Sequence, residues 1–362
     1  MKAIILVGGF GTRLRPLTLS VPKSIVDFCD KPIMVHQIAA LAEAGVKEII
    51  LAINYQSDKI QKYLDVYEKE YGVKIICSKE DEPMGTGGPL RLAKDLLTKD
   101  NEEGLFFCFN SDVICNFPLK ELLEFHKSHG GEGTLVTTKV EEPSRFGVIL
   151  SDEAGKINEF VEKPQVFVGN DINAGLYLLN TSMIDRIEER PTSIEREIFP
   201  QMAADGKLYT IPLHGFWKDI GQPPDFLKGS ELYLNHLEEN KDERLAHGDN
   251  IRGSVMIHPT ATVSEDALIG PNVSIGENVV VESGARIKNS CIFPDTKVCK
   301  NAFISETIVG RGSTIGKWSR IENLAVIADD VVVKDELFIN GSKILPHKSI
   351  DKSYYQNGDI IM

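Results

Sequence analysis

This chain of 362 residues has only six cysteines, fewer basic than acidic residues (40 against 53) and no long apolar run. Its six cysteines show no C-x-x-C spacing and no disulfide-framework density, which predicts reduced, mostly buried thiols of a cytosolic protein. A formal net charge of −13 argues against a general nucleic-acid binder, which needs a basic face. No stretch approaches the roughly 18 apolar residues of a membrane helix. The first apolar run is too short for a signal peptide. We therefore expect a cytoplasmic protein with neither nucleic acid nor membrane as a partner.

Two common phosphate-binding motifs are also missing. The chain has no G-x-x-x-x-G-K-[ST], and the first glycine turn does not read G-x-G-x-x-G. Instead, three glycines follow an apolar run over 3–7 that predicts a buried strand. Glycine permits positive φ, and successive N–H groups can line a concave anion site. A hydroxyl and three cations follow on the same stretch, which suits a polyphosphate; they are Thr12, Arg13, Arg15 and Lys23. The alternative is a glycine turn with surface arginines.

The first two-thirds of the chain alternate predicted strands and helices. Strands are expected at 3–7, 46–53, 73–77 and 104–110. Helices are expected from Lys31-Pro32 to Gly45, at 57–70 and around 88–98. This order predicts an α/β fold with a mostly parallel, Rossmann-like sheet and helices on both faces. Ligands bind such sheets at the carboxyl ends of the strands. A helix over 225–243 leads out of the domain.

Three further segments follow predicted strands and are candidates for the same cleft. Asn54-Tyr55 is the first, although a simple turn is the alternative. Residues 80–88 form a glycine-lined wall on which a flat base could lie, or an ordinary glycine loop. Asp112 could hold a hard cation such as Mg²⁺. Alternatively, it could be the N-cap of a helix or form an Asx turn.

The last hundred residues have a different period. Isoleucine or valine recurs at fourteen positions from Val263 to Ile339, six residues apart except for two five-residue steps. A six-residue aliphatic repeat predicts a parallel β-helix, here of about four coils. Its open ends favour association with another copy. His258 and His347, at the two ends of the repeat, are interpreted as structural or surface residues. The predicted domains are 1–237 and 253–362, joined by a linker at 238–252.

The glycine stretch carries a more specific pattern, G-F-G-T-R followed by P-K at Pro22-Lys23. This resembles the signature of the sugar-phosphate nucleotidylyltransferases. Other segments resemble the family's motifs as well: G-T-G-G at 85–88, N-S-D at 110–112, F-V-E-K-P at 160–164, N-A-G at 173–175 and W-K-D-I-G at 217–221. The resemblance covers essentially the whole chain. The repeat is itself similar to hexapeptide-repeat proteins, and this likeness implies a left-handed sense for the β-helix.

The resemblance also implies roles for individual residues. Those implied to bind the nucleotide are Leu6, Gly8, Gly9, Gly11, Thr12, Arg13, Lys23, Gly85, Thr86 and Gly87. Those implied to bind the sugar phosphate are Asp112, Gly147, Glu162, Lys163 and Asn173. Mg²⁺ is the implied cofactor, held by Asp112 and Asp219. The implied catalytic residues are Arg13, Lys23, Asp112 and Lys163.

The sequence segments G-T-R-L-R-P-L-T-L-S and D-F-C-D-K-P-I resemble those of the catalytic, beta-type members of the guanylyltransferase branch. That likeness implies transfer from GTP to mannose 1-phosphate, giving GDP-mannose for glycosylation and diphosphate. It implies a homo-oligomer, a hetero-oligomer with a regulatory alpha-type subunit, or both. Ser24 and Gly87 depart from the usual pattern, but neither removes a charged group.

Three alternatives stay open. The first is a glucose-1-phosphate uridylyl-, thymidylyl- or adenylyltransferase, because the sequence resolves base and hexose poorly. The second is a non-catalytic regulatory subunit that senses GDP-mannose. The third is an acyltransferase that works through the hexapeptide repeats.

Overall fold

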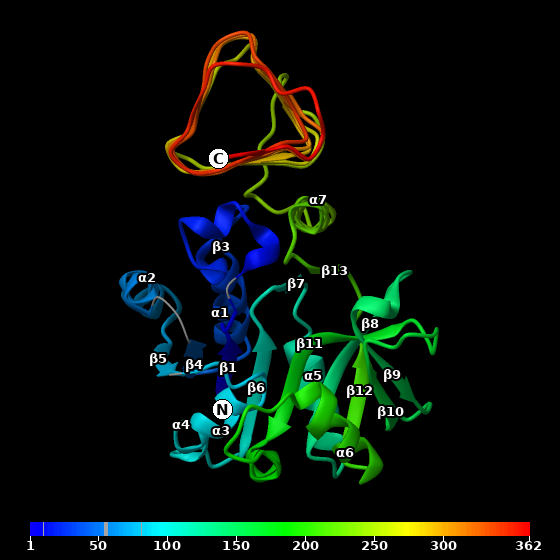
Figure 1. Ribbon diagram of the computed structural model, residues 1–362. Helices are drawn as coiled ribbons and strands as arrows, with labels where there is room; N and C mark the ends of the chain where they lie inside the picture. The colour runs from blue at the N-terminus through cyan, green and yellow to red at the C-terminus, as the bar shows by residue number, and fades with distance from the viewer. Residues whose placement is uncertain (10, 54–56, 81) are drawn as a thin grey trace. The chain divides into compact units, whose positions relative to one another are not determined.

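The computed structural model describes residues 1–9, 11–53, 57–80 and 82–362. Contacts within the chain divide it into two compact units (Figure 1). The first unit comprises Met1–Gly9 and Met34–Trp217, and the second comprises Phe10–Ile33 and Lys218–Met362. The segment that carries most of the predicted phosphate loop therefore packs with the C-terminal part of the chain, although it lies near the N-terminus.

A nine-stranded mixed sheet forms the centre of the first unit. Its longest path runs β10-β9-β11-β6-β1-β4-β5, while β8 pairs with both β11 and β12. The strands of this unit are β1 (Lys2–Leu6), β4 (Glu48–Ile53), β5 (Lys74–Lys79), β6 (Leu105–Asn110), β7 (Val113–Cys115), β8 (Gly133–Lys139), β9 (Gly147–Ser151), β10 (Ile157–Glu162), β11 (Asp171–Asn180) and β12 (Leu208–Pro212). The four strands β6, β1, β4 and β5 are mutually parallel, as their alternation with helices predicts.

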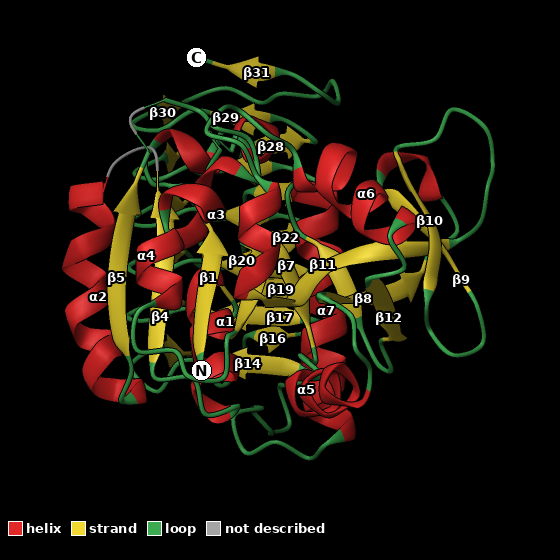
Figure 2. Ribbon diagram, turned by 90° about the horizontal axis from the view of Figure 1, so that it is seen from below, coloured by secondary structure: helices red, strands yellow, loops and turns green. Residues whose placement is uncertain are grey.

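Helices pack on this sheet, and α2 lies against the edge strand β5 (Figure 2). The helices of the first unit are α1 (Ile33–Glu43), α2 (Ser57–Tyr71), α3 (Gly88–Leu92), α4 (Lys94–Thr98), α5 (Leu119–Ser128) and α6 (Phe199–Ala204). The predicted helix at 88–98 is two short helices, because the chain leaves helical geometry at Ala93. The Rossmann-like fold class is confirmed.

The hydrophobic core of the first unit packs against the central strands of the sheet. Tyr177 and Phe199 are fully buried there, with their rings in edge contact at 5.0 Å. The parallel strands are apolar on both faces, and Ile4, Ile5, Ile49 and Ile50 are all fully buried. Such strands form a rigid base for the loops that follow their carboxyl ends.

The second unit begins with a segment described over 11–33, a series of short turns and a small hairpin. Its elements are the 3₁₀ turns at Thr12–Leu14, Leu17–Leu19 and Lys23–Ile25, and the paired strands β2 (Asp27–Phe28) and β3 (Lys31–Pro32). The chain returns to this unit within β13 (Trp217–Asp219), at Lys218, and continues through α7 (Pro223–Glu239). Helix α7 begins with Pro223 and Pro224 in its first turn, where proline costs no hydrogen bond.

A parallel β-helix forms the rest of the second unit, and it has the triangular outline of three sheets (Figure 1). The first sheet contains β14 (Val255–Ile257), β17 (Val273–Ile275), β20 (Ser290–Ile292), β23 (Ile308–Val309), β26 (Val326–Ile327), β29 (Lys343–Ile344) and β31 (Ile360–Ile361). The second contains β15 (Thr262–Val263), β18 (Val280–Val281), β21 (Lys297–Val298), β24 (Thr314–Ile315), β27 (Val332–Val333) and β30 (Ser349–Ile350). The third contains β16 (Leu268–Ile269), β19 (Arg286–Lys288), β22 (Phe303–Ser305), β25 (Arg320–Glu322) and β28 (Phe338–Asn340). The arrangement is consistent with a left-handed helix.

The hexad repeat predicts the inside of this β-helix correctly but underestimates its length. Of the fourteen repeat positions, all but the half-buried Val263 are buried. The prediction of about four coils is wrong, since the three sheets give five complete coils. Strands at Val255–Ile257 and Ile360–Ile361 extend the helix beyond the regular repeat, because coil-to-coil pairing continues after the aliphatic spacing becomes irregular. At the ends of the repeat, His258 contacts Thr260 and His347 contacts Asp330.

The six cysteines are free thiols, and all except the half-buried Cys77 are buried. Within the described residues, no helix combines the length and apolarity that crossing a membrane requires.

Candidate functional site

The loops predicted to bind ligands in the first unit follow neighbouring parallel strands. Leu6 at the end of β1 pairs with Asn110 at the end of β6 on one side and with Ala52 in β4 on the other. Glu80 follows β5 and donates its backbone N–H to the carbonyl of Ile53 at 2.9 Å. Leu6, Gly8, Glu80 and Asp112 are therefore at or just beyond the same carboxyl edge of the sheet, where open α/β sheets bind ligands. The candidate Asn54-Tyr55 lies outside the described residues.

The glycines of the loop at 85–88 make room for the protein's own backbone. A Cβ at Gly85 would lie 2.5 Å from the carbonyl oxygen of Thr192, and Gly85 has φ +72°. Gly87 donates its N–H to that same carbonyl at 2.8 Å. The Thr86 hydroxyl donates to Glu195 at 2.6 Å and accepts from the N–H of Ile194 at 3.0 Å. The loop is thus held in one conformation by residues a hundred positions further along the chain.

Glu80 is a feature of this loop that the sequence alone does not single out. Its side chain is buried, and among the described residues its Oε1 has no hydrogen-bond partner. Its Oε2 accepts the Met84 N–H at 3.4 Å. Burial raises the pKa of the Glu80 carboxyl. A buried carboxylate with unused acceptor capacity beside a glycine loop is suited to a ligand that donates N–H groups. The available sequence signal was its position directly after a strand.

Asp112 lies in the short turn between β6 and β7. The Gln37 side chain donates to the carbonyls of Asn110 and Val113 at 2.8 and 3.2 Å, so the turn is fixed from below by α1. A Cβ at Gly175 would lie 2.9 Å from Nδ2 of Asn110, which explains the glycine there. The structure therefore brings the N-S-D and N-A-G segments side by side.

The four other residues predicted to bind the sugar phosphate gather at the ends of β9, β10 and β11. Gly147 pairs with Glu162, and the adjacent Val148 pairs with Ile172. A Cβ at Gly147 would lie 2.9 Å from Oε2 of Glu162. Lys163 is exposed, with its Nζ 3.2 Å from Oε1 of Glu162. Its backbone has φ 47°, and its N–H donates to the Phe146 carbonyl at 3.0 Å.

Asn173 is more constrained than its predicted role requires. Its Nδ2 donates to the Tyr177 hydroxyl at 2.8 Å, and its Oδ1 accepts the Gly175 N–H at 3.0 Å. Since Tyr177 is fully buried, these bonds tie Asn173 to the core. The Asn173 side chain can offer a ligand only the second proton of Nδ2 and the remaining lone pair of Oδ1.

The glycine turn at the start of the chain adopts the backbone geometry that its composition predicts. Gly9 and Gly11 have φ values of +124° and +60°, which other residues rarely adopt. The Thr18 hydroxyl donates to the Gly11 carbonyl at 2.8 Å and closes the turn. Thr12 and Arg13 are exposed in the 3₁₀ turn that follows.

Within the second unit, Arg13, Lys23 and Asp219 converge on Gly221. A Cβ at Gly221 would lie 2.8 Å from Oδ1 of Asp219, 3.2 Å from Nη2 of Arg13 and 3.2 Å from Nζ of Lys23. Asp219 Oδ1 also accepts the Gly221 N–H at 2.8 Å. Two cations from the glycine loop thus gather beside the predicted metal-binding carboxylate. A cluster of this kind is suited to an anion with a bound cation, such as a metal triphosphate.

The predicted metal ligands come from different units, Asp112 from the first and Asp219 from the second. Their pairing therefore stays a prediction. Both offer carboxylate oxygens, the donor that Mg²⁺ prefers, and a metal that carries substrate phosphates needs only one or two protein carboxylates. Among the residues that the structure describes, no group of three or more His, Cys, Asp or Glu side chains is placed to hold a metal.

Comparison with protein families matches both parts of the chain. Residues 2–236 match the nucleotidyl transferase family, and residues 251–360 match the GMPPB C-terminal domain. Among solved structures, HddC from Yersinia pseudotuberculosis complexed with GMP-PN is 28% identical, with a TM-score of 0.53. The match covers 64% of this chain and 99% of that one.

Curated relatives match over the whole chain. The mannose-1-phosphate guanylyltransferase catalytic subunit beta of Dictyostelium discoideum is 56% identical over 98% of both chains. Mannose-1-phosphate guanylyltransferase 1 of Arabidopsis thaliana is 52% identical over 100% of both. The chain therefore belongs to the nucleotidyl transferase family and, within it, to the mannose-1-phosphate guanylyltransferases.

Proposed function

We propose that the chain joins GTP and α-D-mannose 1-phosphate to give GDP-mannose, which supplies glycosylation, and diphosphate. The observation that carries this proposal is the convergence of Arg13, Lys23 and Asp219 on Gly221. Two cations beside a carboxylate match a triphosphate bound with a metal ion. The names of the full-length relatives support the choice of substrates, and a structural neighbour solved with GMP-PN supports a guanine nucleotide.

In this reaction a phosphate oxygen of mannose 1-phosphate attacks the α-phosphorus of GTP, and diphosphate leaves with the electrons of the broken P–O bond. The second pKa of a phosphate monoester is about 6, so the attacking group is already largely dianionic at neutral pH. No general base is needed. Catalysis then depends on alignment and on neutralising charge.

The glycine loop and the cluster around Gly221 would hold the nucleotide's phosphates. Arg13 and Lys23 would neutralise the triphosphate, and Arg13 would stabilise the departing diphosphate. The backbone N–H groups around Gly8, Gly9 and Gly11 would complete the anion site. Asp112 and Asp219 would hold Mg²⁺, which when bound neutralises and orients the α-phosphate.

The first unit would hold the sugar phosphate and the base. Lys163 would present the phosphate of mannose 1-phosphate, while Glu162 and Asn173 would bond the hexose hydroxyls. Gly85, Thr86 and Gly87 would form the wall against the base. Glu80 would accept the N1–H and the 2-amino group of guanine, the two adjacent donors that distinguish guanine from adenine.

A substrate panel tests the proposal. The purified chain is incubated with Mg²⁺, each of GTP, ATP, UTP and dTTP, and either mannose or glucose 1-phosphate, and diphosphate release is measured. We expect the highest kcat/KM for GTP with mannose 1-phosphate. Preference for another pair would assign the chain to a different sugar nucleotide. GDP-mannose binding without diphosphate release from any pair would indicate a regulatory subunit.

We also propose a cytoplasmic location and an assembly through the β-helix, with another copy or with a regulatory alpha-type subunit. A mass from light scattering that matches a single chain would contradict the homo-oligomer.

A further inference from the structure

The loop that carries Lys23 is packed against the β-helix. Directly after Lys23 the chain makes a tight turn, in which the Val26 N–H donates to the Lys23 carbonyl at 3.2 Å. The Val26 carbonyl in turn accepts the Ile33 N–H at 3.0 Å, which closes the β2–β3 hairpin. Asp27 therefore lies only four residues beyond Lys23, on backbone that these bonds hold in place.

Asp27 forms an ion pair with Arg311 of the β-helix. Nη2 of Arg311 lies 2.7 Å from Oδ1 of Asp27 and 2.6 Å from its Oδ2. The Asp27 side chain is 11% exposed and that of Arg311 is 34% exposed. Burial raises the pKa of Asp27 to about 6, and the charges of Asp329 and Glu277 add to this effect while Arg311 opposes it. Without Arg311, the ionised Asp27 would be a buried charge with two acidic neighbours. The ionised state of Asp27 therefore depends on Arg311.

Arg311 is itself fixed by the coils of the β-helix. Its N–H donates to Oδ1 of Asp329 at 2.9 Å, and its carbonyl accepts the Asp330 N–H at 2.8 Å. The preceding Gly310 packs so closely on the next coil that a Cβ would lie 2.5 Å from the carbonyl carbon of Ala328. The guanidinium thus extends from a rigid base.

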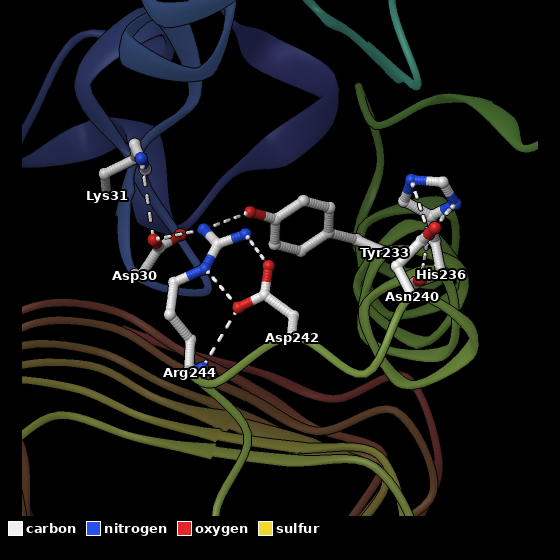
Figure 3. Close-up of polar contacts among 7 residues, drawn as sticks. All are labelled: Asp30, Lys31, Tyr233, His236, Asn240, Asp242 and Arg244. Carbon is white, nitrogen blue, oxygen red and sulfur yellow. Dashed lines mark hydrogen bonds and ion pairs between the residues drawn. The ribbon is translucent and has the colours of Figure 1, made fainter.

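Further contacts join the same segment to helix α7 and the chain after it. The ring of Phe28 meets that of Phe226 edge-on at 5.2 Å, and Phe226 lies 6.2 Å from Phe293 of the β-helix. Figure 3 shows Arg244 between Asp30 and Asp242, with its Nη1 3.1 Å from Oδ2 of Asp30. Helix α7 begins four residues after Asp219. The cluster around Gly221 is built from two segments, the glycine loop and the residues that lead into α7. Both segments are therefore continuous with parts of the chain that contact the β-helix.

We propose that Arg311 is a positioning residue for the nucleotide: by pairing with Asp27 it fixes the backbone that places Lys23 beside Arg13 and Asp219. The β-helix thereby contributes to triphosphate binding without touching the ligand. This inference rests on the proposed role of Lys23 in holding the triphosphate.

The test compares GTP affinity, measured by titration calorimetry with Mg²⁺ present, in Arg311→Gln, Arg311→Lys, Asp27→Asn and the double variant Asp27→Asn with Arg311→Gln. The matched control is Arg320→Gln, which removes another β-helix arginine whose partners, Phe303 and Glu322, lie within the β-helix. We expect Arg311→Gln to weaken GTP binding about tenfold. Arg311→Lys should recover part of that loss. The KM for mannose 1-phosphate should stay within about twofold, and Asp27→Asn should add little to Arg311→Gln.

Unchanged GTP affinity in a folded Arg311→Gln would overturn the proposal, as would an equal loss in Arg320→Gln or equal losses for both substrates. If Arg311→Gln does not fold, the GTP affinities of Arg311→Lys and Asp27→Asn test the proposal in its place. The wild-type panel separates this result from the proposed function. If the wild type prefers another nucleotide, the variants are titrated with that nucleotide. If it turns nothing over, the proposed function fails and GTP affinity alone decides the role of Arg311.

Discussion

Charged side chains carry most of the proposed chemistry, and they differ in how they are held. Arg13 is exposed on a 3₁₀ turn, whereas Glu80 is buried against a loop that is bonded to Thr192. An exposed cation can close on a triphosphate as it arrives. A buried carboxylate can instead discriminate between ligands, because an unmatched polar group at that depth is costly.

Removing a charge at the proposed metal and phosphate groups should reduce turnover with little loss of stability. We expect Asp112→Asn and Arg13→Ala each to lower kcat about a hundredfold or more, the scale of a lost electrostatic contact in a transition state. Steady-state kinetics at saturating substrates measure this. Asp185→Asn, at a surface carboxylate paired with Lys94, is the control and should leave kcat unchanged. Near wild-type turnover in Asp112→Asn or Arg13→Ala would remove that residue from the site.

Glu80 should set the preference for guanine. Glu80→Gln should lower kcat/KM for GTP by about tenfold to a hundredfold, since a hydrogen bond to a charged group is worth about 1.5–3 kcal/mol. Inosine triphosphate, which lacks the 2-amino group, should be a poor substrate of the wild type and lose less in the variant. The exposed Glu82, changed to Gln, is the matched control. An equal loss for both nucleotides would contradict a role in reading the base.

At the scale of single elements, the loop at 85–88 shows that the conformation of a motif depends on residues outside it. The sequence pattern predicts a wall for a base, and the structure shows that Gly85 and Gly87 also admit the carbonyl of Thr192. The partner segment around Thr192 and Glu195 has no pattern of its own. It is therefore visible only once the chain is folded.

Gly85→Ala should strain this loop, because its φ of +72° is unfavourable for alanine and the new Cβ would meet the Thr192 carbonyl oxygen at 2.5 Å. We expect the free energy of unfolding to fall by about 1–3 kcal/mol and the KM for GTP to rise. Denaturant titration and kinetics measure the two effects. Gly130→Ala, where the Cβ would meet no atom of the described residues within 4 Å, should change neither. Equal behaviour of the two variants would show that the loop tolerates movement.

The hexad repeat shows how much a sequence can reveal when one period dominates. The inward isoleucines and valines are predicted one by one, because every coil repeats the same packing. The number of coils is underestimated because terminal coils need only backbone pairing. Similarly, alternating strands and helices predict the Rossmann-like sheet, while the break at Ala93 is not visible in the pattern.

For the molecule as a whole, the division into two units was not predictable from the order of its motifs. The described residues 11–33 belong to one compact unit with α7 and the β-helix, whereas the strand that precedes them belongs to the other. In the sequence, the glycine motif follows β1 directly and predicts a single loop that continues from this strand. Contacts such as that between Asp27 and Arg311, 284 residues apart, leave no periodic trace in the sequence.

The two units should respond oppositely to acid. In the first unit, burial and the nearby His126 lower the pKa of His129 to about 4, so its stabilising effect is lost as pH falls from about 6.5 towards 4. In the second, the pKa of Asp27 is raised to about 6, so its ionisation removes up to about 3 kcal/mol of stability as pH rises from about 4 to 6.

Denaturant unfolding at pH 4.5 and 7 checks this difference in His129→Phe and Asp27→Asn. Each variant should lose the pH dependence that its own residue contributes, in opposite directions. The phenyl ring can keep the stacking that His129 makes with Tyr209. A change in the same direction in both variants would contradict these assignments.

The central claim is that the chain transfers the guanylyl group of GTP intact to mannose 1-phosphate. The most direct measurement supplies GTP carrying ³²P at its α-phosphorus, together with mannose 1-phosphate and Mg²⁺, and separates the products by chromatography. The account predicts label in GDP-mannose, an equal amount of unlabelled diphosphate, and no transfer when mannose 1-phosphate is omitted. Label that stays in GTP, or appears in GMP or GDP without GDP-mannose, would contradict it.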